Sequence, residues 1–219
     1  MTLFGDHPPS ITRIVPTKGG LASVYAGRKR VATIPAKQAD ALGIAIGAPW
    51  TAELSDRAAL ALESLRARKK AVALLRVKAR SRAELNARLV QSGFSPPAAD
   101  AALHELAASG LVNDQALAQH AASRTLERGG SAQAAAARLQ SRGLDHHAIQ
   151  TALDAAARDH AGSELDRATQ AARNRLAKLP VSTPATARHR RLLSALAALG
   201  YDEDTAREAV ARVLGYIDE

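Results

Sequence analysis

The heptapeptide LVQSGFS at residues 89–95 decides the fold of this chain, because two variants of it recur, LQSRGLD at 139–145 and LAALGYD at 196–202. Each begins with leucine, has glycine at its fifth position and a large apolar residue at its sixth, and ends in Ser or Asp. Glycine is typical of the left-handed residue that ends a helix, and Ser or Asp of the residue that caps the next one. Each heptapeptide therefore predicts a corner between two helices, with the apolar residue packed inside it.

The helix after each corner is expected to carry a matching apolar face. Six, nine and ten residues after the glycine, positions that share one side of a helix hold only aliphatic residues. These are Ala99, Ala102 and Leu103, then Ile149, Ala152 and Leu153, then Ala206, Ala209 and Val210. Apolar matches alone could arise by chance in an alanine-rich chain, but glycine, apolar plug and cap coincide in all three. We interpret the three segments as an internal repeat, whose corner glycines should be equivalent.

A third helix is expected before each pair, which makes every repeat trihelical. The expected helices include 56–79, 82–92, 96–108, 115–127, 163–178 and 203–214. Ser81 with Glu84 forms a capping-box pattern, and Asp114 is expected to cap the helix that follows Gly110. The predicted fold class is mainly α, with trihelical repeats at 55–112, 113–160 and 161–219 stacked into an elongated, curved solenoid.

The first 54 residues differ in composition from the rest. Residues 1–10 are interpreted as a disordered leader, and residues 11–54 as a small N-terminal β-hairpin module. Its strand-like segments are Ile11–Val15, Leu21–Ala26 and Val31–Ile34, separated by glycine turns. A short helix at Ala36–Leu42, ended by Gly43, is expected to follow.

Composition limits the classes of function. The 219 residues include 30 Lys and Arg against 21 Asp and Glu, a formal net charge of +9, and a chain this basic usually meets a polyanion. No cysteine is present, which excludes disulfides, thiolate catalysis and cysteine-based zinc sites, and which fits a cytoplasmic location. No signal-peptide pattern and no apolar run long enough to span a membrane is visible.

No catalytic constellation is visible, so the chain is not expected to be an enzyme or to need a metal or cofactor. The seven histidines are scattered, and His146 and His147 point in different directions at the start of a helix. Gly129-Gly130-Ser131 resembles a phosphate-binding loop but lacks the lysine and the preceding strand. We interpret it as a turn between helices, with Ser131 as the N-cap.

The most informative feature is a basic run without acidic residues between Arg66 and Arg82. At about 100° per residue, five of its residues fall within roughly a third of the helix circumference, opposite Ala71, Leu75 and Ala79. These five are Arg66, Lys69, Lys70, Arg76 and Arg80, and Arg82 lies just beyond them. A second cluster comprises Arg188, Arg190 and Arg191, and Arg124, Arg128, Arg138 and Arg142 lie between the two. A solvated helix face is the ordinary alternative, but we expect these side chains to contact DNA or an acidic protein surface.

Recognition of a specific DNA sequence is poorly supported. A helix–glycine–helix corner invites a helix-turn-helix interpretation, in which the second helix reads bases with Arg, Asn or Gln. Helix 96–108 instead carries Asp100 and Glu105, and helix 203–214 begins with Glu203 and Asp204. We therefore expect contacts to phosphates of single- and double-stranded DNA, independent of sequence. A basic transcriptional regulator and an RNA-associated adaptor remain alternatives, although the few aromatic residues form no regular stacking stripe.

Taken in order, the motifs resemble those of the RecX family. The matching segments are Arg80-Ser81-Arg82-Ala83-Glu84-Leu85 with Leu89 and Gly93-Phe94, then Gly110-Leu111-Val112-Asn113-Asp114 with Ala118 and Arg124, then Arg128-Gly129, Leu139 and Gly143. Residues 11–14, 27–28 and 47–51 are similar to the hairpin extension of some members. The resemblance covers nearly the whole chain, and its motifs are structural.

The resemblance implies a regulatory protein that binds along a RecA–DNA filament, and we expect the protein to be a monomer. It implies inhibition of strand exchange, of ATP hydrolysis and of RecA-stimulated repressor cleavage, and so a role in DNA repair, recombination and the SOS response. It implies DNA affinity and no catalysis, and it supplies no active-site residues. The choice of the Arg66–Arg82 run as the contact surface rests on charge alone.

Overall fold

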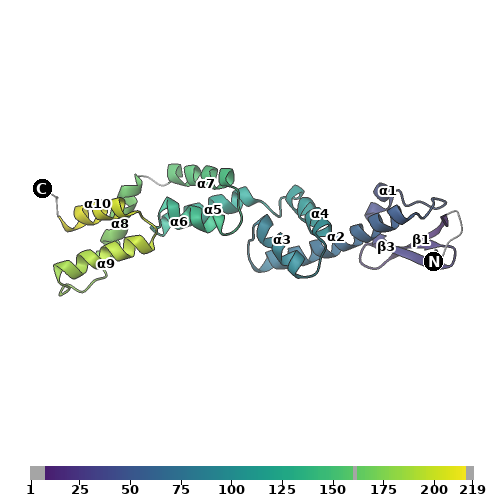
Figure 1. Ribbon diagram of the computed structural model, residues 1–219, viewed down its shortest axis with the longest axis horizontal. Helices are drawn as coiled ribbons and strands as arrows, with labels where there is room; N and C mark the ends of the chain where they lie inside the picture. The colour runs from purple at the N-terminus through teal and green to yellow at the C-terminus, as the bar shows by residue number, and fades with distance from the viewer. Residues whose placement is uncertain (1–7, 160–161, 216–219) are drawn as a thin grey trace. The chain divides into compact units, whose positions relative to one another are not determined.

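The computed structural model describes residues 8–159 and 162–215, and these form two compact units, with the boundary between Val112 and Asn113 (Figure 1). Within the described residues the chain is mainly helical, with one small sheet near its N-terminus, as the sequence predicted. The elements of the first unit are β1 Ile11–Thr17, β2 Leu21–Ala26, β3 Lys29–Pro35, a 3-10 turn Ala36–Gln38, α1 Ala39–Leu42, α2 Ala52–Val77, α3 Arg82–Gln91 and α4 Pro96–Ala108. Those of the second are α5 Asp114–Glu127, α6 Ala132–Gln140, α7 His146–Asp159, α8 Glu164–Leu176, α9 Ala185–Ala198 and α10 Glu203–Leu214.

The N-terminal module is a three-stranded antiparallel sheet in the order β1-β2-β3. One face, with Ala22, Val24 and Ile34, is buried against Leu54 and Ala58 of α2. Pro9 and Ser10, which the sequence assigned to the leader, belong to this module. The Trp50 amide donates to the Pro9 carbonyl at 2.8 Å, and Ser10 forms a β-bridge with Pro49. Residues 1–7 of the expected leader lie outside the described residues.

Helix α2 has 26 residues and packs against different neighbours along its length. Ala58 is buried against the sheet, whereas Ala67 and Ala71 are buried against α3 and α4. Ala58 and Ala67 are nine residues apart, which is about two and a half turns, so they lie on opposite sides of the helix axis. One helix thus joins the sheet to the first three-helix repeat.

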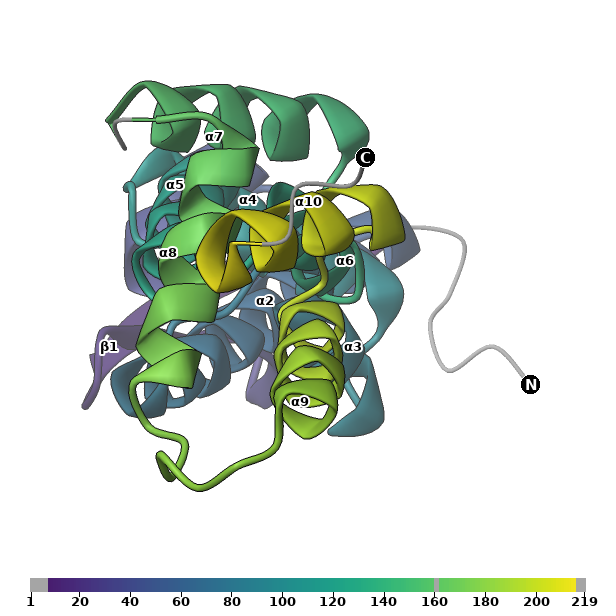
Figure 2. The same ribbon diagram turned by 90° about the vertical axis from the view of Figure 1, so that its left-hand side faces the viewer.

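The three predicted corners have the expected backbone. Gly93, Gly143 and Gly200 have φ values of 88°, 74° and 86°, in the left-handed region that favours glycine. Leu89, Leu139 and Leu196 are buried beside them in the cores of their repeats. Figure 2 shows the loop that joins α8 to α9 in the last repeat. The boundary expected between residues 160 and 161 lies outside the described residues, and the curved solenoid stays a prediction.

In the second unit, the corner between α5 and α6 contacts the corner between α9 and α10. The amide and hydroxyl of Ser131 donate to the carbonyls of Leu199 and Gly200, at 3.0 and 2.6 Å. The Tyr201 hydroxyl donates to the Gly129 carbonyl at 3.1 Å. Ser131 also caps α6 as predicted, accepting from the Ala134 amide at 3.0 Å. Hydrogen bonds to main-chain carbonyls therefore join the second and third repeats through their turns.

Two predicted helix caps are wrong. The side chain of Asn113, rather than that of Asp114, accepts the hydrogen bond from the Ala116 amide that caps α5. Ser95 makes no side-chain cap for α4, and its hydroxyl instead donates to Glu63 at 2.8 Å. The first two residues of α4 are prolines, which have no N–H, so a capping oxygen at Ser95 would find few donors. The capping box of Ser81 and Glu84 is confirmed.

The predicted end of α2 is also wrong. The helix stops at Val77, and Lys78 is already extended, so Ala79 and Arg80 are not helical. A helix that continued to residue 79 would leave a single residue to reverse the chain before the Ser81 cap. Ala79 is exposed rather than buried.

Candidate nucleic-acid interface

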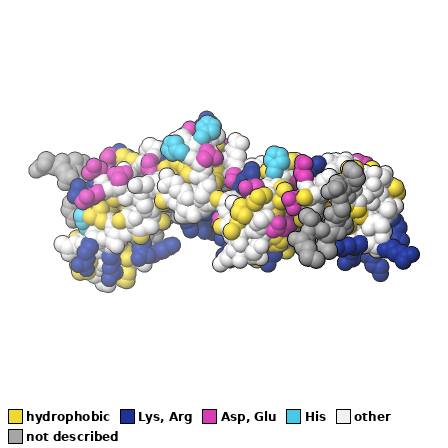
Figure 3. Space-filling view, turned by 45° about the vertical axis from the view of Figure 1, so that its right-hand side comes forward, with side chains coloured by type: hydrophobic (Ala, Val, Ile, Leu, Met, Phe, Trp, Pro, Cys, Tyr) yellow, Lys and Arg dark blue, Asp and Glu magenta, His cyan; other side chains and the backbone are white. Residues whose placement is uncertain are grey.

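Positive charge is concentrated in the first unit. It carries 16 of the 30 Lys and Arg residues and 8 of the 21 Asp and Glu residues, a formal charge of +8, which leaves +1 for the second unit. Figure 3 shows a group of Lys and Arg side chains at the N-terminal sheet. An extended polyanion would therefore be attracted to the first unit above all.

Four predicted contact residues form one exposed stripe on α2, which we call the basic stripe: Arg66, Lys69, Lys70 and Arg76. Among the described residues, none of the four forms an ion pair. On the opposite side Ala67 and Ala71 are buried and Leu75 is half-buried against the core of the first repeat. The backbone therefore presents four unpaired cations on one side of a well-packed helix, and exposed cations without carboxylate partners suit contact with phosphates.

Arg80 and Arg82 do not extend this stripe. Arg80 lies in the turn after α2 and is partly buried, and its Nε atom is buried without a hydrogen-bond partner among the described residues. Arg82 is exposed and is the first residue of α3. The prediction that Arg80 shares the helix face was wrong, because it assumed that α2 continued to residue 79.

Arg68, although it lies within the basic run, forms an ion pair inside the first unit and is not part of the basic stripe. Its guanidinium pairs with a carboxylate oxygen of Glu105 at 3.5 Å, and the Gln38 amide donates to the other oxygen at 3.4 Å. These contacts connect α2, α4 and the turn after the sheet. Both partners of the ion pair are nearly half exposed, so the pair contributes little to stability.

The second predicted cluster lies on α9, in the other unit. Arg190 and Arg191 are exposed, whereas Arg188 is half-buried and donates to the Val181 carbonyl in the loop before the helix. Arg188 therefore helps to order that loop, and Arg190 and Arg191 remain the accessible cations of the cluster.

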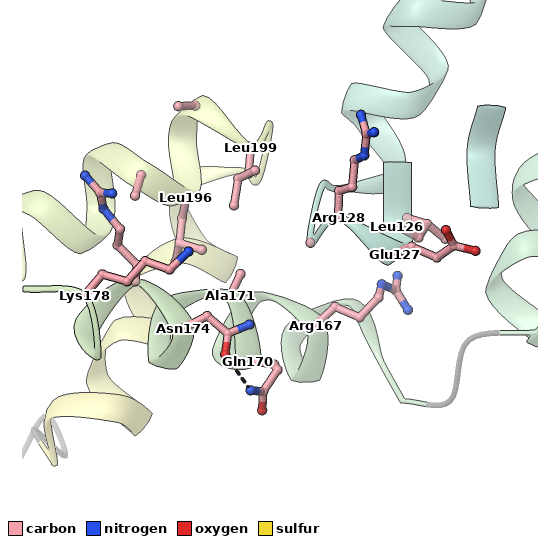
Figure 4. A pocket seen from close by; sticks show the side chains of 14 residues that line it. Leu126, Glu127, Arg128, Arg167, Gln170, Ala171, Asn174, Lys178, Leu196 and Leu199 are labelled. Carbon is pink, nitrogen blue, oxygen red and sulfur yellow. Dashed lines mark hydrogen bonds between the residues drawn. The ribbon is translucent and has the colours of Figure 1, made fainter. Parts of the chain in front are cut away.

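The second unit also holds an open hollow of about 550 Å³ with cationic sides (Figure 4). Its lining includes Leu126, Ala171, Leu196 and Leu199 together with one carboxylate, Glu127, and four cations, Arg128, Arg167, Arg175 and Lys178. The sequence singled out only Arg128 among these cations. Arg167, Arg175 and Lys178 recur at spacings of eight and three residues along and just beyond α8, a helical periodicity that could have revealed their common side.

Other kinds of site find little support in the part of the chain that the structure describes. It contains no group of three or more His, Asp or Glu side chains placed to hold a metal ion. In the same residues no helix is long and apolar enough to cross a membrane. Glu203 and Asp204, at the start of α10, pair with Arg207, so the start of that helix presents carboxylates rather than base-reading side chains.

Comparison with known proteins supplies a sequence match and a fold match. Residues 67–106, from the second half of α2 through most of α4, match the family model for RecX, first three-helix domain. A crystal structure of the regulatory protein RecX has a TM-score of 0.72 to this chain at 15% identity, covering 94% of this chain and 98% of its own. RecX from Lactobacillus salivarius has a TM-score of 0.55 at 15% identity, covering 69% and 96%. No curated protein matches the chain.

Proposed function

We propose that this chain, which belongs to the RecX family, binds a RecA–DNA filament and restrains it. Binding lowers the recombinase, ATPase and coprotease activities of RecA, and so modulates DNA repair and the SOS response. The protein acts as a monomer in the cytoplasm, where the filament forms, and needs neither a catalytic residue nor a cofactor.

The observation that carries this proposal is the basic stripe. Its four side chains are exposed, unpaired among the described residues, and fixed on one face of a helix whose other face is packed. Contacts of this kind neutralise phosphates without reading bases, so the affinity for DNA is independent of sequence and falls steeply as salt rises. A filament presents phosphates and protein surface together, and a chain of several repeats offers more than one surface to it.

The decisive experiment measures RecA itself. DNA-dependent ATP hydrolysis and strand exchange are followed while the full-length chain is added from substoichiometric to equimolar amounts. We expect both rates to fall at substoichiometric ratios. Unchanged ATP hydrolysis and strand exchange at an equimolar ratio would show that the proposal is wrong.

A transcriptional regulator that acts without RecA is the alternative. The acidic start of α10 makes base reading by the helix after that corner unfavourable. Binding to duplexes of different sequence separates the two functions. A preference of about a hundredfold for one duplex, equivalent to about 2.7 kcal/mol, would favour the alternative.

A further inference from the structure

We propose that the outer face of the N-terminal sheet is a binding site for single-stranded DNA, formed by a row of three side chains, Arg13, Tyr25 and Arg30. No part of the proposed function requires this site. The choice of DNA over RNA as the occupant rests on the proposed function, whereas the choice of a single strand rests on the residues themselves.

The strand register places the three residues side by side. Arg13 of β1 is paired with Tyr25 of β2, and Tyr25 is paired with Arg30 of β3. Directly paired residues of neighbouring strands project from the same face of a sheet. The guanidinium of Arg13 lies over the Tyr25 ring, 4.2 Å from its centre. The row is therefore an aromatic ring between two arginines.

The row lies on the face of the sheet away from α2. Val24 and Ala26, the neighbours of Tyr25 in β2, are buried, and Val24 packs in the core against α2. Side chains alternate between the two faces of a strand, so Tyr25 projects away from that core. Arg13 and Arg30 are exposed and Tyr25 is half-buried. All three can be reached by a ligand from solvent.

No carboxylate competes for these arginines within the sheet. From Pro8 to Ala39 the sequence contains six basic residues and no Asp or Glu. Among the described residues neither Arg13 nor Arg30 forms an ion pair. The six basic residues are Arg13, Lys18, Arg28, Lys29, Arg30 and Lys37. A sheet whose charged side chains are all basic has an anion as its complementary ligand.

The aromatic ring identifies the kind of anion. Proteins that bind single strands combine cations that follow the backbone with side chains on which bases stack, either aromatic rings or guanidinium planes. Tyr25 and the Arg13 guanidinium above it supply such a surface, and Arg30 flanks it with a second cation. A duplex would leave this surface unused, because its bases are already stacked on one another. The row therefore fits a single strand better than a duplex.

The test is binding of a short fluorescent oligothymidylate to the full-length chain, followed by anisotropy over a range of salt concentrations without RecA. Removing both arginines (R13A/R30A) should weaken binding and flatten the log–log salt slope by about 0.7 to 1.4, as expected for the loss of the phosphate contact of Arg30 and of up to one more at Arg13. Tyr25→Leu should weaken binding about fivefold or more by removing the stacking surface, whereas Tyr25→Phe should retain it.

The matched control is K18A/K37A. These two exposed lysines carry the same charge in the same module, but they lie at the opposite end of the sheet, where the Ala36 amide donates to the Gly20 carbonyl. An equal loss in this control and in R13A/R30A would overturn the site, because net charge alone would then explain binding. Equal losses for a blunt duplex of the same length would overturn the assignment to single strands. Tighter binding of the matching RNA strand would overturn the assignment to DNA.

Thermal melting of each variant tests whether the sheet is folded. If Tyr25→Leu unfolds, the double arginine variant and Tyr25→Phe still test the site. Because RecA is absent, failure of the row leaves the proposed function standing. Conversely, a chain that binds oligothymidylate through the row without affecting RecA would refute the proposed function and retain this site.

Discussion

Glu63 of α2 accepts two hydrogen bonds from Ser95 at the start of α4, one from its amide to Oε1 at 2.7 Å and one from its hydroxyl to Oε2 at 2.8 Å. The start of α4 is therefore stabilised by a carboxylate from a neighbouring helix. These two hydrogen bonds hold the pKa of Glu63 below its ordinary value, although partial burial acts in the opposite direction. The pair links the helix that contacts the sheet to the helix after the first corner.

Replacing Glu63 by Gln should lower the free energy of unfolding by about 1 kcal/mol at neutral pH. The amide cannot accept both hydrogen bonds as a charged carboxylate does, and solvent access keeps the loss at the lower end of the usual range. Chemical denaturation of both proteins at pH 7 measures the difference. No difference would show that the pair contributes nothing to stability.

The same pair predicts a pH dependence. Because the pKa of Glu63 is lower in the folded than in the unfolded chain, its stabilising effect is complete above the unfolded pKa, about 4.3, and is lost as the pH falls through the folded pKa. The stability difference between the wild type and Glu63→Gln should therefore shrink on acidification below about pH 4.3. Asp166 and Asp202 also have lowered pKa values, so the difference between the two proteins is the quantity to compare. A constant difference down to about pH 3 would contradict the prediction.

Gly200→Ala should destabilise the chain more than Gly93→Ala, so the equivalence of the corner glycines that the sequence predicted holds for their backbone conformation but not for their surroundings. Strain at positive φ costs about 1 kcal/mol in each case. A Cβ at Gly93 would meet open space, whereas at Gly200 it would lie 2.6 Å from the Ala134 Cβ atom. Overpacking should add about 1–3 kcal/mol at Gly200. Chemical denaturation of the two variants measures both losses of stability. Equal losses would mean that Ala134 can move away from a Cβ at residue 200 without lowering the free energy of unfolding.

Tyr201→Phe should cost about 0.5–1.5 kcal/mol, because it removes the hydrogen bond from the Tyr201 hydroxyl to the Gly129 carbonyl while keeping the packed ring. Burial raises the pKa of Tyr201, in agreement with a phenol held away from water. Tyr25→Phe is the matched control, because the Tyr25 hydroxyl has no hydrogen-bond partner among the described residues, and its stability should be unchanged. Equal melting curves for the two variants would argue against a contribution from this bond.

Replacing Lys69, Lys70 and Arg76 by Ala should leave the fold intact and weaken binding to DNA and to the RecA–DNA filament. The three side chains are exposed and alanine favours helix, so stability should change little. The matched control replaces three exposed cations of the second unit that were not predicted to bind, Arg158, Arg173 and Lys178. Filament titrations beside melting curves separate the two effects, and equal binding by both triple variants would mean that the basic stripe is only a solvated surface.

Leu75→Ala, on the packed side of the same helix, should have the reverse effect. We expect a loss of about 2 kcal/mol, at the low end of the range because the side chain is half-buried, and unchanged binding by the folded fraction. The same titration and melting curve measure both quantities.

The sequence predicted features that depend on neighbours in the chain. The corners at Gly93, Gly143 and Gly200 and the cap at Ser81 arise from residues within a few positions of one another. The contact of Ser131 with Gly200 joins residues 69 positions apart, and no local pattern specifies it. The row around Tyr25 depends on irregularities in both strand pairings, between Ile11 and Arg13 and between Val24 and Tyr25. One such irregularity changes which side chains share a face, so the row could not be predicted from alternation alone.

The same distinction holds for the candidate contact surface. Arg66, Lys69, Lys70 and Arg76 share a face as the helical period predicted, because the helix is regular there. Arg80 was misplaced because the end of a helix depends on the residues beyond it, here the capping box at Ser81. The role of these residues in binding stays a prediction.

Helix α2 also sets the rotational phase between the sheet and the first three-helix repeat. At 1.5 Å per residue its 26 residues span about 39 Å, with Ala58 on the sheet side near one end and Ala71 on the repeat side near the other. One residue inserted between them would turn the sheet by about 100° about the helix axis, whereas four would turn it by only about 40° while moving it about 6 Å away. The number of residues in this helix thus fixes both the distance and the rotation between the sheet and the repeat. Insertions into the helix should therefore be tolerated according to the rotation they add, more than according to their length.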